Sequence, residues 1–145
     1  MKLLVQRVSK ASVEVQAEQI ASINKGVLVF VGFDRDDNYQ KLESLTDKLL
    51  NYKIFNDLKG KVSMSLIETN NEVLIVPQVT LSVATKKGTK PSFSHAAGPE
   101  AGNQLFDDFQ KLIEVKYKKP AVGMFGADMS VSLVNEGPIT FWFES

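Results

Sequence analysis

Residues 128–145 read DMSVSLVNEGPITFWFES, with the pair Gly137-Pro138 between two segments in which apolar and polar residues alternate. Alternation of this kind is typical of β-strands. Proline has no N–H and a fixed φ, and glycine permits backbone angles that other residues resist, so a regular strand cannot continue through this pair. Its simplest interpretation is a hairpin turn that leaves bare backbone exposed. An X-Pro bond can also be cis at modest cost.

Length and composition predict one domain covering residues 1–145. The chain has 145 residues, of which 43% are hydrophobic, enough for a substantial core. No run of about eighteen apolar residues is present, so we expect no association with a membrane. The start of the chain becomes charged at Lys2 and Arg7, too early for a secretory signal. We therefore expect a cytoplasmic protein.

The residue types restrict the chemistry. There is no cysteine and one histidine, which excludes thiolate nucleophiles and makes a metal centre unexpected. No glycine-rich phosphate-binding motif is present, so we predict neither a cofactor nor a metal. Seventeen basic and seventeen acidic residues cancel, which leaves only local clusters such as Lys86, Lys87 and Lys90 as contacts for nucleic acid.

Hydrophobic periodicity predicts a strand-rich α/β fold with a mostly antiparallel sheet. Leucine spacing indicates a helix at about 38–51, and an apolar stripe after Pro99 indicates a second at about 99–116. Turn residues at 56–60 and 70–71 predict antiparallel neighbours. The expected strands are 3–8, 12–16, 20–23, 27–31, 54–55, 62–67, 73–76 and the two segments of the C-terminal hairpin.

A second proline interrupts the apolar run that begins at Val73. Pro77 should end or bulge that strand and leave the backbone N–H groups of Gln78, Val79 and Thr80 free. A row of free N–H groups can hold an acyl carbonyl and stabilise negative charge on it, and the Thr80 hydroxyl and Gln78 amide add polar groups. The alternative is an ordinary edge strand with a polar end.

Thr80 could also act as the nucleophile of a conventional hydrolase, with His95 as its base. His95 falls in a polar stretch between Ser82 and Gly98, where a lone histidine is commonly structural or solvent-facing. No Gly-x-Ser-x-Gly motif supports side-chain nucleophilic catalysis. A conventional ester hydrolase therefore remains an alternative interpretation.

Several motifs together resemble the D-aminoacyl-tRNA deacylase family. They are Gln6-Arg7-Val8, Gln78-Val79-Thr80-Leu81, Lys87-Gly88 followed by Pro91-Ser92-Phe93, Ala127-Asp128-Met129, and Asn135-Glu136-Gly137-Pro138-Ile139-Thr140. The last is the most specific, and the likeness extends along the whole chain.

The resemblance implies an enzyme that hydrolyses the ester of D-aminoacyl-tRNA, and of glycyl-tRNA, while it rejects the L-aminoacyl form. It implies a homodimer in which Gly137 and Pro138, joined by a cis peptide bond, reach into the active site of the partner subunit. Their backbone carbonyls bind the amino group and leave no room for an L side chain, which is selection by exclusion. Its partners are aminoacyl-tRNA and a second copy of the chain, without DNA.

The same resemblance assigns roles to further residues. Gln78 and Thr80 are the expected catalytic residues, and Val79, Met129 and Phe125 are expected to line the substrate pocket. Lys86, Lys87 and Lys90 are candidate contacts for tRNA. The 2'-hydroxyl of the terminal adenosine is expected to assist hydrolysis, so no strong protein base is needed.

Two positions depart from the family pattern Ser-Gln-Phe-Thr. Pro77 stands in place of serine and Val79 in place of phenylalanine, which removes a hydroxyl, a backbone donor and an aromatic ring. We expect activity to survive, because the N–H groups that follow Pro77 are retained. The alternative is a dimeric tRNA-binding protein of the same fold that is catalytically impaired.

Overall fold

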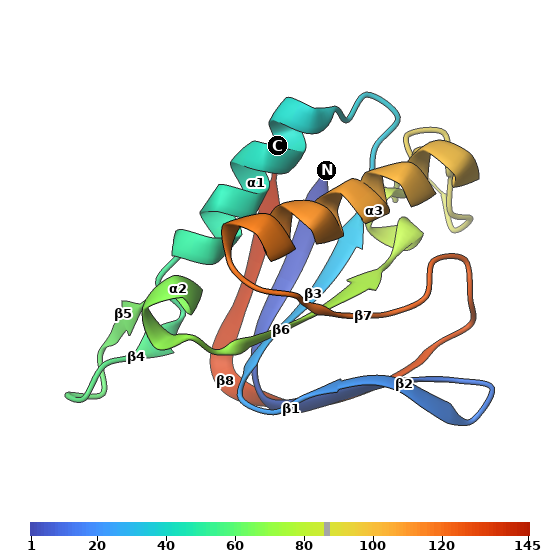
Figure 1. Ribbon diagram of the computed structural model, residues 1–145. Helices are drawn as coiled ribbons and strands as arrows, with labels where there is room; N and C mark the ends of the chain where they lie inside the picture. The colour runs from blue at the N-terminus through green and yellow to red at the C-terminus, as the bar shows by residue number, and fades with distance from the viewer. Residues whose placement is uncertain (86–87) are drawn as a thin grey trace.

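Helices α1 and α3 lie on one face of a β-sheet in the computed structural model, which describes residues 1–85 and 88–145 (Figure 1). The strands are β1 (Lys2–Val15), β2 (Glu18–Ile23), β3 (Gly26–Gly32), β4 (Phe55–Asn56), β5 (Val62–Met64), β6 (Glu72–Pro77), β7 (Ala121–Val122) and β8 (Ser130–Glu144). The helices are α1 (Tyr39–Asn51), α2 (Leu66–Thr69) and α3 (Pro99–Lys116), with a 3₁₀ turn, η1 (Val79–Ser82).

The predicted α/β fold is confirmed, and the sheet is mixed. Strand β1 is antiparallel to β2, β3 and β8, whereas β6 is parallel to both β3 and β7. The turn at Asn70 and Asn71 was expected to join two antiparallel strands, and this prediction is wrong, because β6 pairs with β3 in parallel. The chain crosses the sheet through α1 between β3 and β6, and such a crossover returns β6 parallel to β3.

Both predicted long helices are confirmed. The Asn38 side chain accepts a hydrogen bond from the N–H of Lys41 and so begins α1, and Pro99 occupies the first turn of α3. Their apolar faces pack on alternate residues of β1, β3 and β6. This core contains Leu42, Leu45, Leu49, Phe106, Phe109, Leu112, Ile113, Leu3, Val5, Val27, Val29, Val31, Val73 and Ile75.

The opposite face of the sheet is covered in part by the β1–β2 arm. Strand β1 is continuous, so the break predicted between Val8 and Ser12 is wrong. Ser9 and Lys10 are exposed, but they lie at a shift of register where β1 bends toward β2 and stays paired with β8 (Figure 1). The arm buries Val13 and Ile23 against Leu28.

The strand predicted over 62–67 is also wrong. Only Val62–Met64 is extended, and α2 follows. Ser65 accepts from the N–H of Glu68 and the Glu68 carboxylate accepts from the N–H of Ser65, a reciprocal cap that starts the helix. The Ser-x-x-Glu spacing was visible in the sequence.

The hairpin expected at Gly137-Pro138 is wrong. Strand β8 continues through the pair and remains on the same partner, β1, on both sides. Gln6 pairs with Thr140 and Val8 pairs with Asn135, so residues 136–139 lie opposite the single residue Arg7. The proline therefore occupies a bulge, where its missing N–H breaks no ladder bond.

No helix within residues 1–85 and 88–145 is long and apolar enough to cross a membrane.

Candidate active site

An apolar pocket of about 620 Å³ opens where β6 ends and α3 begins. Its volume is in the range usual for small-molecule sites. Three segments that are distant in the sequence form it: the end of β6 with η1, the loop before α3, and the loop after β7. The lining residues are 77–79, 93, 96–99 and 125–127.

The backbone beside Pro77 has a defined pattern of hydrogen bonds. The Gln78 N–H donates to the Val31 carbonyl at 2.7 Å, so the expectation of a free N–H at Gln78 is wrong. Val79 and Thr80 begin η1, and the first N–H groups of a helical turn have no partner within it. In the described part of the chain, these two N–H groups form no other hydrogen bond. Two donors without a partner therefore remain at the start of η1, one on Val79, which lines the pocket, and one on the next residue, Thr80.

Gly32 allows η1 to lie close to β3. A Cβ at Gly32 would lie 2.8 Å from the Cβ of Leu81 and 2.9 Å from the Gln78 carbonyl oxygen. Any side chain there would push η1 away from the sheet, because both neighbours are backbone or the root of a side chain. The position of the Val79 and Thr80 N–H groups therefore depends on this glycine.

The predicted catalytic side chains of Gln78 and Thr80 lie together. Gln78 Nε2 donates to Thr80 Oγ1 at 2.6 Å, and Val79 is 48% exposed at the pocket. His95 is exposed and lines a separate hollow with Lys2, Ser82 and Thr85. Among the described residues Thr80 and His95 form no hydrogen bond, so the arrangement provides Thr80 with no imidazole base.

Phe125 and Met129 are placed differently. Phe125 lines the pocket, and its ring centroid lies 6.1 Å from that of Phe106 in the core. Met129 is absent from the lining. Its Sδ accepts from the N–H of Met124 at 3.3 Å and packs beside Gly123, where a Cβ would come within 2.9 Å of the sulfur. In a single chain, Met129 supports the loop after β7 rather than the pocket.

The predicted tRNA contacts Lys86 and Lys87 lie outside the described residues. Lys90 is described and exposed. It belongs to the segment between Ala84 and Ser92, two residues that form an isolated antiparallel bridge near the pocket loop.

The bulge in β8 presents backbone to solvent. The Gly137–Pro138 peptide bond is cis. Neither residue has a ladder partner on β1, and both are exposed. Among the described residues no side-chain donor binds the carbonyl of Gly137 or Pro138, and neither residue is paired in the β1–β8 ladder, so both carbonyls are placed to accept hydrogen bonds from a ligand.

Arg7, on the neighbouring strand β1, holds the bulge through its side chain. It was not predicted as a site residue from the sequence. Its side chain is buried, and Nε donates to the Glu136 carbonyl at 3.1 Å. Nη1 donates to the Ile54 carbonyl at 2.9 Å and to Asn56 Oδ1 at 3.1 Å. The signal was present, because Arg7 falls on the core-facing side of β1 with Leu3 and Val5, where a charge needs partners.

The pocket and the bulge are separate within one chain. Pro77 is level with Val31 on β3, and Arg7 is level with Val27. Four residues of strand correspond to about 13 Å along the sheet, and β1 and β3 lie between β8 and β6. One chain therefore does not bring Gly137 and Pro138 to the pocket.

Asp34, which forms an isolated β-bridge with the pocket residue Ala96, is paired with two cationic groups. Burial opposes ionisation of Asp34, yet hydrogen bonds from Lys2, at 2.6 Å, and from the amino group of Met1 bring the net pKa below its ordinary value. Within residues 1–85 and 88–145, no group of three or more His, Asp or Glu residues is placed to hold a metal ion.

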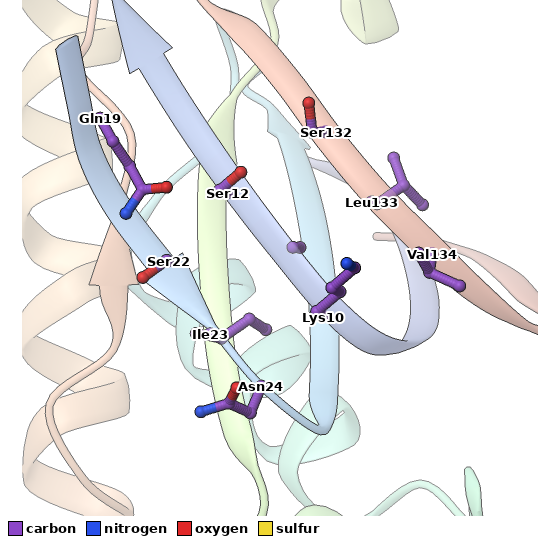
Figure 2. Close-up of a pocket in the computed structure, with 10 residues that line it drawn as sticks. Lys10, Ser12, Gln19, Ser22, Ile23, Asn24, Ser132, Leu133 and Val134 are labelled. Atoms are coloured by element: carbon purple, nitrogen blue, oxygen red, sulfur yellow. The ribbon is translucent and has the colours of Figure 1, made fainter.

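A second hollow of about 420 Å³ lies on the β1–β2 arm and the first half of β8 (Figure 2). Ser22, Ser12 and Ser132 lie on three neighbouring strands, with Ser12 paired to each of the others. None of the described residues predicted for the site lines this hollow, so it is distinct from the pocket beside Pro77.

Comparison with known proteins identifies the family. The model of a family described as D-Tyr-tRNA(Tyr) deacylase matches residues 4–144. The chain belongs to the D-aminoacyl-tRNA deacylases. These are hydrolases, and a member from Francisella tularensis subsp. tularensis (strain WY96-3418) is 44% identical over 99% of each chain. Another, from Dichelobacter nodosus (strain VCS1703A), is 46% identical over 96% of each chain.

Solved structures agree with this fold. One described as a c-Myc DNA Unwinding Element Binding Protein has a TM-score of 0.96 and 38% identity, over 100% of this chain and 99% of that chain. A second, described as a probable eukaryotic D-amino acid tRNA deacylase, has a TM-score of 0.83 over 98% and 97% of the two chains. Its identity is 22%, so it supports the deacylase fold alone.

Proposed function

We propose that this protein hydrolyses the ester bond of D-aminoacyl-tRNA and of glycyl-tRNA, and releases free tRNA and the amino acid. The observation that carries the proposal is the apolar pocket beside the start of η1, where the N–H of Val79, a lining residue, and that of the adjacent Thr80 have no partner within the described residues. An acyl ester needs donors at its carbonyl oxygen, because negative charge develops there during hydrolysis. Membership of the deacylase family supports this substrate class.

In this mechanism the protein positions the ester and does not attack it. The N–H groups of Val79 and Thr80 hold the acyl carbonyl, and the Gln78–Thr80 hydrogen bond keeps the η1 side chains in place. Phe125 and Val79 enclose the acyl group and reduce access of water. The 2'-hydroxyl of the terminal adenosine assists the attack of water, so His95 is not required.

The complete site forms between two subunits. Gly137 and Pro138 lie far from the pocket of their own chain, and β8 is an edge strand with Val134 and Trp142 each nearly half exposed. A free edge and exposed apolar side chains favour pairing with a second copy. In the homodimer, the partner subunit's Gly137 and Pro138 cover the pocket. Their free carbonyls bind the substrate amino group, and their backbone excludes an L side chain.

The acceptor end of tRNA runs along the segment that carries Lys90, with Lys86 and Lys87 beside it in the sequence. Affinity for tRNA therefore falls with salt, and removal of the three lysines reduces that salt dependence. The chain has no net charge, so its contact with nucleic acid is local. The proposed nucleic-acid ligand is tRNA and not DNA, because the ester to be hydrolysed is carried by tRNA. The protein acts in the cytoplasm, where charged tRNA is used.

One assay tests the activity. Purified protein is incubated with D-Tyr-tRNA, L-Tyr-tRNA and Gly-tRNA, and intact ester is measured over time. We expect hydrolysis of the D and glycyl esters and little hydrolysis of the L ester. His95→Ala should retain the D activity, and its loss in that variant would favour the conventional hydrolase. Intact D-Tyr-tRNA throughout would contradict the proposal.

The double variant Pro77→Ser, Val79→Phe tests the alternative of an impaired tRNA-binding protein. If the backbone donors alone are needed, the natural chain and the variant should hydrolyse D-Tyr-tRNA at similar rates. Tight binding of tRNA by the natural chain without turnover, together with rapid hydrolysis by the variant, would support the impaired protein instead.

Mixed dimers test the shared site. Gly32→Ala damages the pocket, and Gly137→Val damages the bulge. If each site combines the pocket of one subunit with the bulge of the other, unfolding and refolding the two variants together restores about a quarter of the sites. Each variant refolded alone is the control. No gain of activity in the mixture would place both elements in the same subunit.

A further inference from the structure

The side chain of Asn135 links the residues on either side of the bulge in β8. Its Nδ2 donates to the Arg7 carbonyl at 2.9 Å and to the Ile139 carbonyl at 3.2 Å. Both acceptors are carbonyl oxygens, so only the NH₂ end of the amide can face them. The orientation of the Asn135 amide is therefore fixed by its surroundings.

These two hydrogen bonds replace the ladder that the bulge interrupts. Residues 136–139 lie opposite Arg7 alone, and the Asn135 amide joins the start of the bulge to its end and to β1. The carbonyls of Glu136 and Ile139 are bound, by Arg7 and Asn135 respectively. The carbonyls between them, those of Gly137 and Pro138, have no ladder partner and no side-chain donor within the described residues, which leaves them for a ligand.

The amide also contacts Gly137. A Cβ built on Gly137 would lie 3.3 Å from Asn135 Oδ1, which is closer than most real contacts of that kind. The Asn135 side chain therefore lies close to Gly137, beside the space that a Cβ on that residue would occupy. A change at Asn135 removes the hydrogen bonds that tie the start of the bulge to Ile139. Among the side chains described, Arg7 then holds the bulge at Glu136 alone, which leaves Gly137 and Pro138 less restrained.

We propose that Asn135 is a positioning residue that determines the preference for D-aminoacyl over L-aminoacyl esters. The inference rests on the proposed function, because it assigns the Gly137 and Pro138 carbonyls to the substrate amino group. Asn135 touches neither the ester nor the pocket. It acts by fixing the direction of these carbonyls, and a misplaced backbone no longer excludes an L side chain.

The test compares hydrolysis of D-Tyr-tRNA and L-Tyr-tRNA by the full chain and three variants. Asn135→Ala removes both hydrogen bonds, and Asn135→Asp keeps the shape of the side chain but removes the donors. Ser132→Ala, at an exposed position of the same strand, is the matched control. We expect the ratio of D to L kcat/KM to fall at least about tenfold in both Asn135 variants and to stay unchanged in the control.

A pH series separates positioning from general stability. A protonated carboxyl can donate one hydrogen bond to a carbonyl, whereas a carboxylate cannot. The D to L ratio of Asn135→Asp should therefore rise as pH falls from about 7 to 4, the range in which an aspartate carboxylate begins to be protonated, while the ratio of the natural chain changes little. A purely structural role would alter thermal unfolding without this recovery.

The outcomes distinguish the two proposals. Strong D preference in the natural chain, together with an unchanged ratio in both Asn135 variants, would overturn the role of Asn135 and leave the proposed function standing. Failure of the natural chain to hydrolyse D-Tyr-tRNA would overturn both.

Discussion

The pocket beside Pro77 and the bulge at Gly137-Pro138 are built in different ways. The pocket forms where strands end, and its polar groups are backbone N–H groups left free by a local 3₁₀ turn. The bulge interrupts a strand, and it is supported by Arg7 and Asn56, which lie far from it in the sequence. The pocket therefore depends on local backbone and close packing, whereas the bulge depends on long-range side-chain hydrogen bonds.

Arg7→Ala should cause the largest loss of stability, because it removes the side chain that holds the bulge in β8. The variant leaves the buried Ile54 carbonyl and the Glu136 carbonyl without their donor. We expect a loss of about 3 kcal/mol in the free energy of unfolding, measured in urea, together with a reduced D to L ratio.

Arg7→Lys is the control for charge. It keeps the cation but cannot reach both carbonyls with a planar fork, so it should recover only part of the loss. A change below about 1 kcal/mol for Arg7→Ala would mean that the bulge does not depend on this side chain.

Gly32→Ala should have the next largest effect, and it should act through the pocket. The added methyl group displaces η1 and the N–H groups of Val79 and Thr80. We expect the rate of D-Tyr-tRNA hydrolysis to fall about tenfold to a hundredfold, with a stability cost of about 1–3 kcal/mol.

Gly26→Ala is its matched control at the other end of β3. A Cβ there collides with the carbonyl group of Glu72, so stability should also fall, but η1 is not touched. Equal loss of activity in the two folded variants would contradict a specific role of Gly32 in placing the backbone donors.

Lowering the pH should cause the smallest loss of stability. It should act through Glu68 in α2, whose partner Lys53 precedes Ile54 and Asn56, the residues that bind Arg7. A hydrogen bond from Lys53, and then those from Ser65, lower the pKa of Glu68 from 4.5 to about 2. Glu68 therefore stabilises the fold above pH 4.5, and this contribution is lost as pH falls toward 2.

The thermal midpoint should consequently fall between pH 5 and pH 2, and by a smaller amount in Glu68→Gln than in the natural chain. Glu18→Gln, at an exposed position of β2, removes the same charge as a control. If Glu68→Gln and the natural chain lose stability in parallel, the Lys53–Glu68 pair does not contribute to folding.

Local patterns in the sequence were sufficient for the two long helices. The leucine spacing after Asn38 and the apolar stripe after Pro99 gave their positions, because a helix is defined by contacts three or four residues apart. The end of β6 at Pro77 was predicted for the same reason, since proline acts on its own backbone.

The sequence by itself determined the α/β class, the two long helices and the family, and it marked Gly137-Pro138 as a point where a regular strand is interrupted. Only the tertiary structure decided that the pair lies in a bulge, that β6 runs parallel to β3, and that Gln78 donates to Val31. It also placed Arg7 and Asn135 at the bulge, although they are 128 residues apart. Periodicity records only neighbours along the chain, whereas strand partners and long-range hydrogen bonds are fixed when the whole sheet assembles.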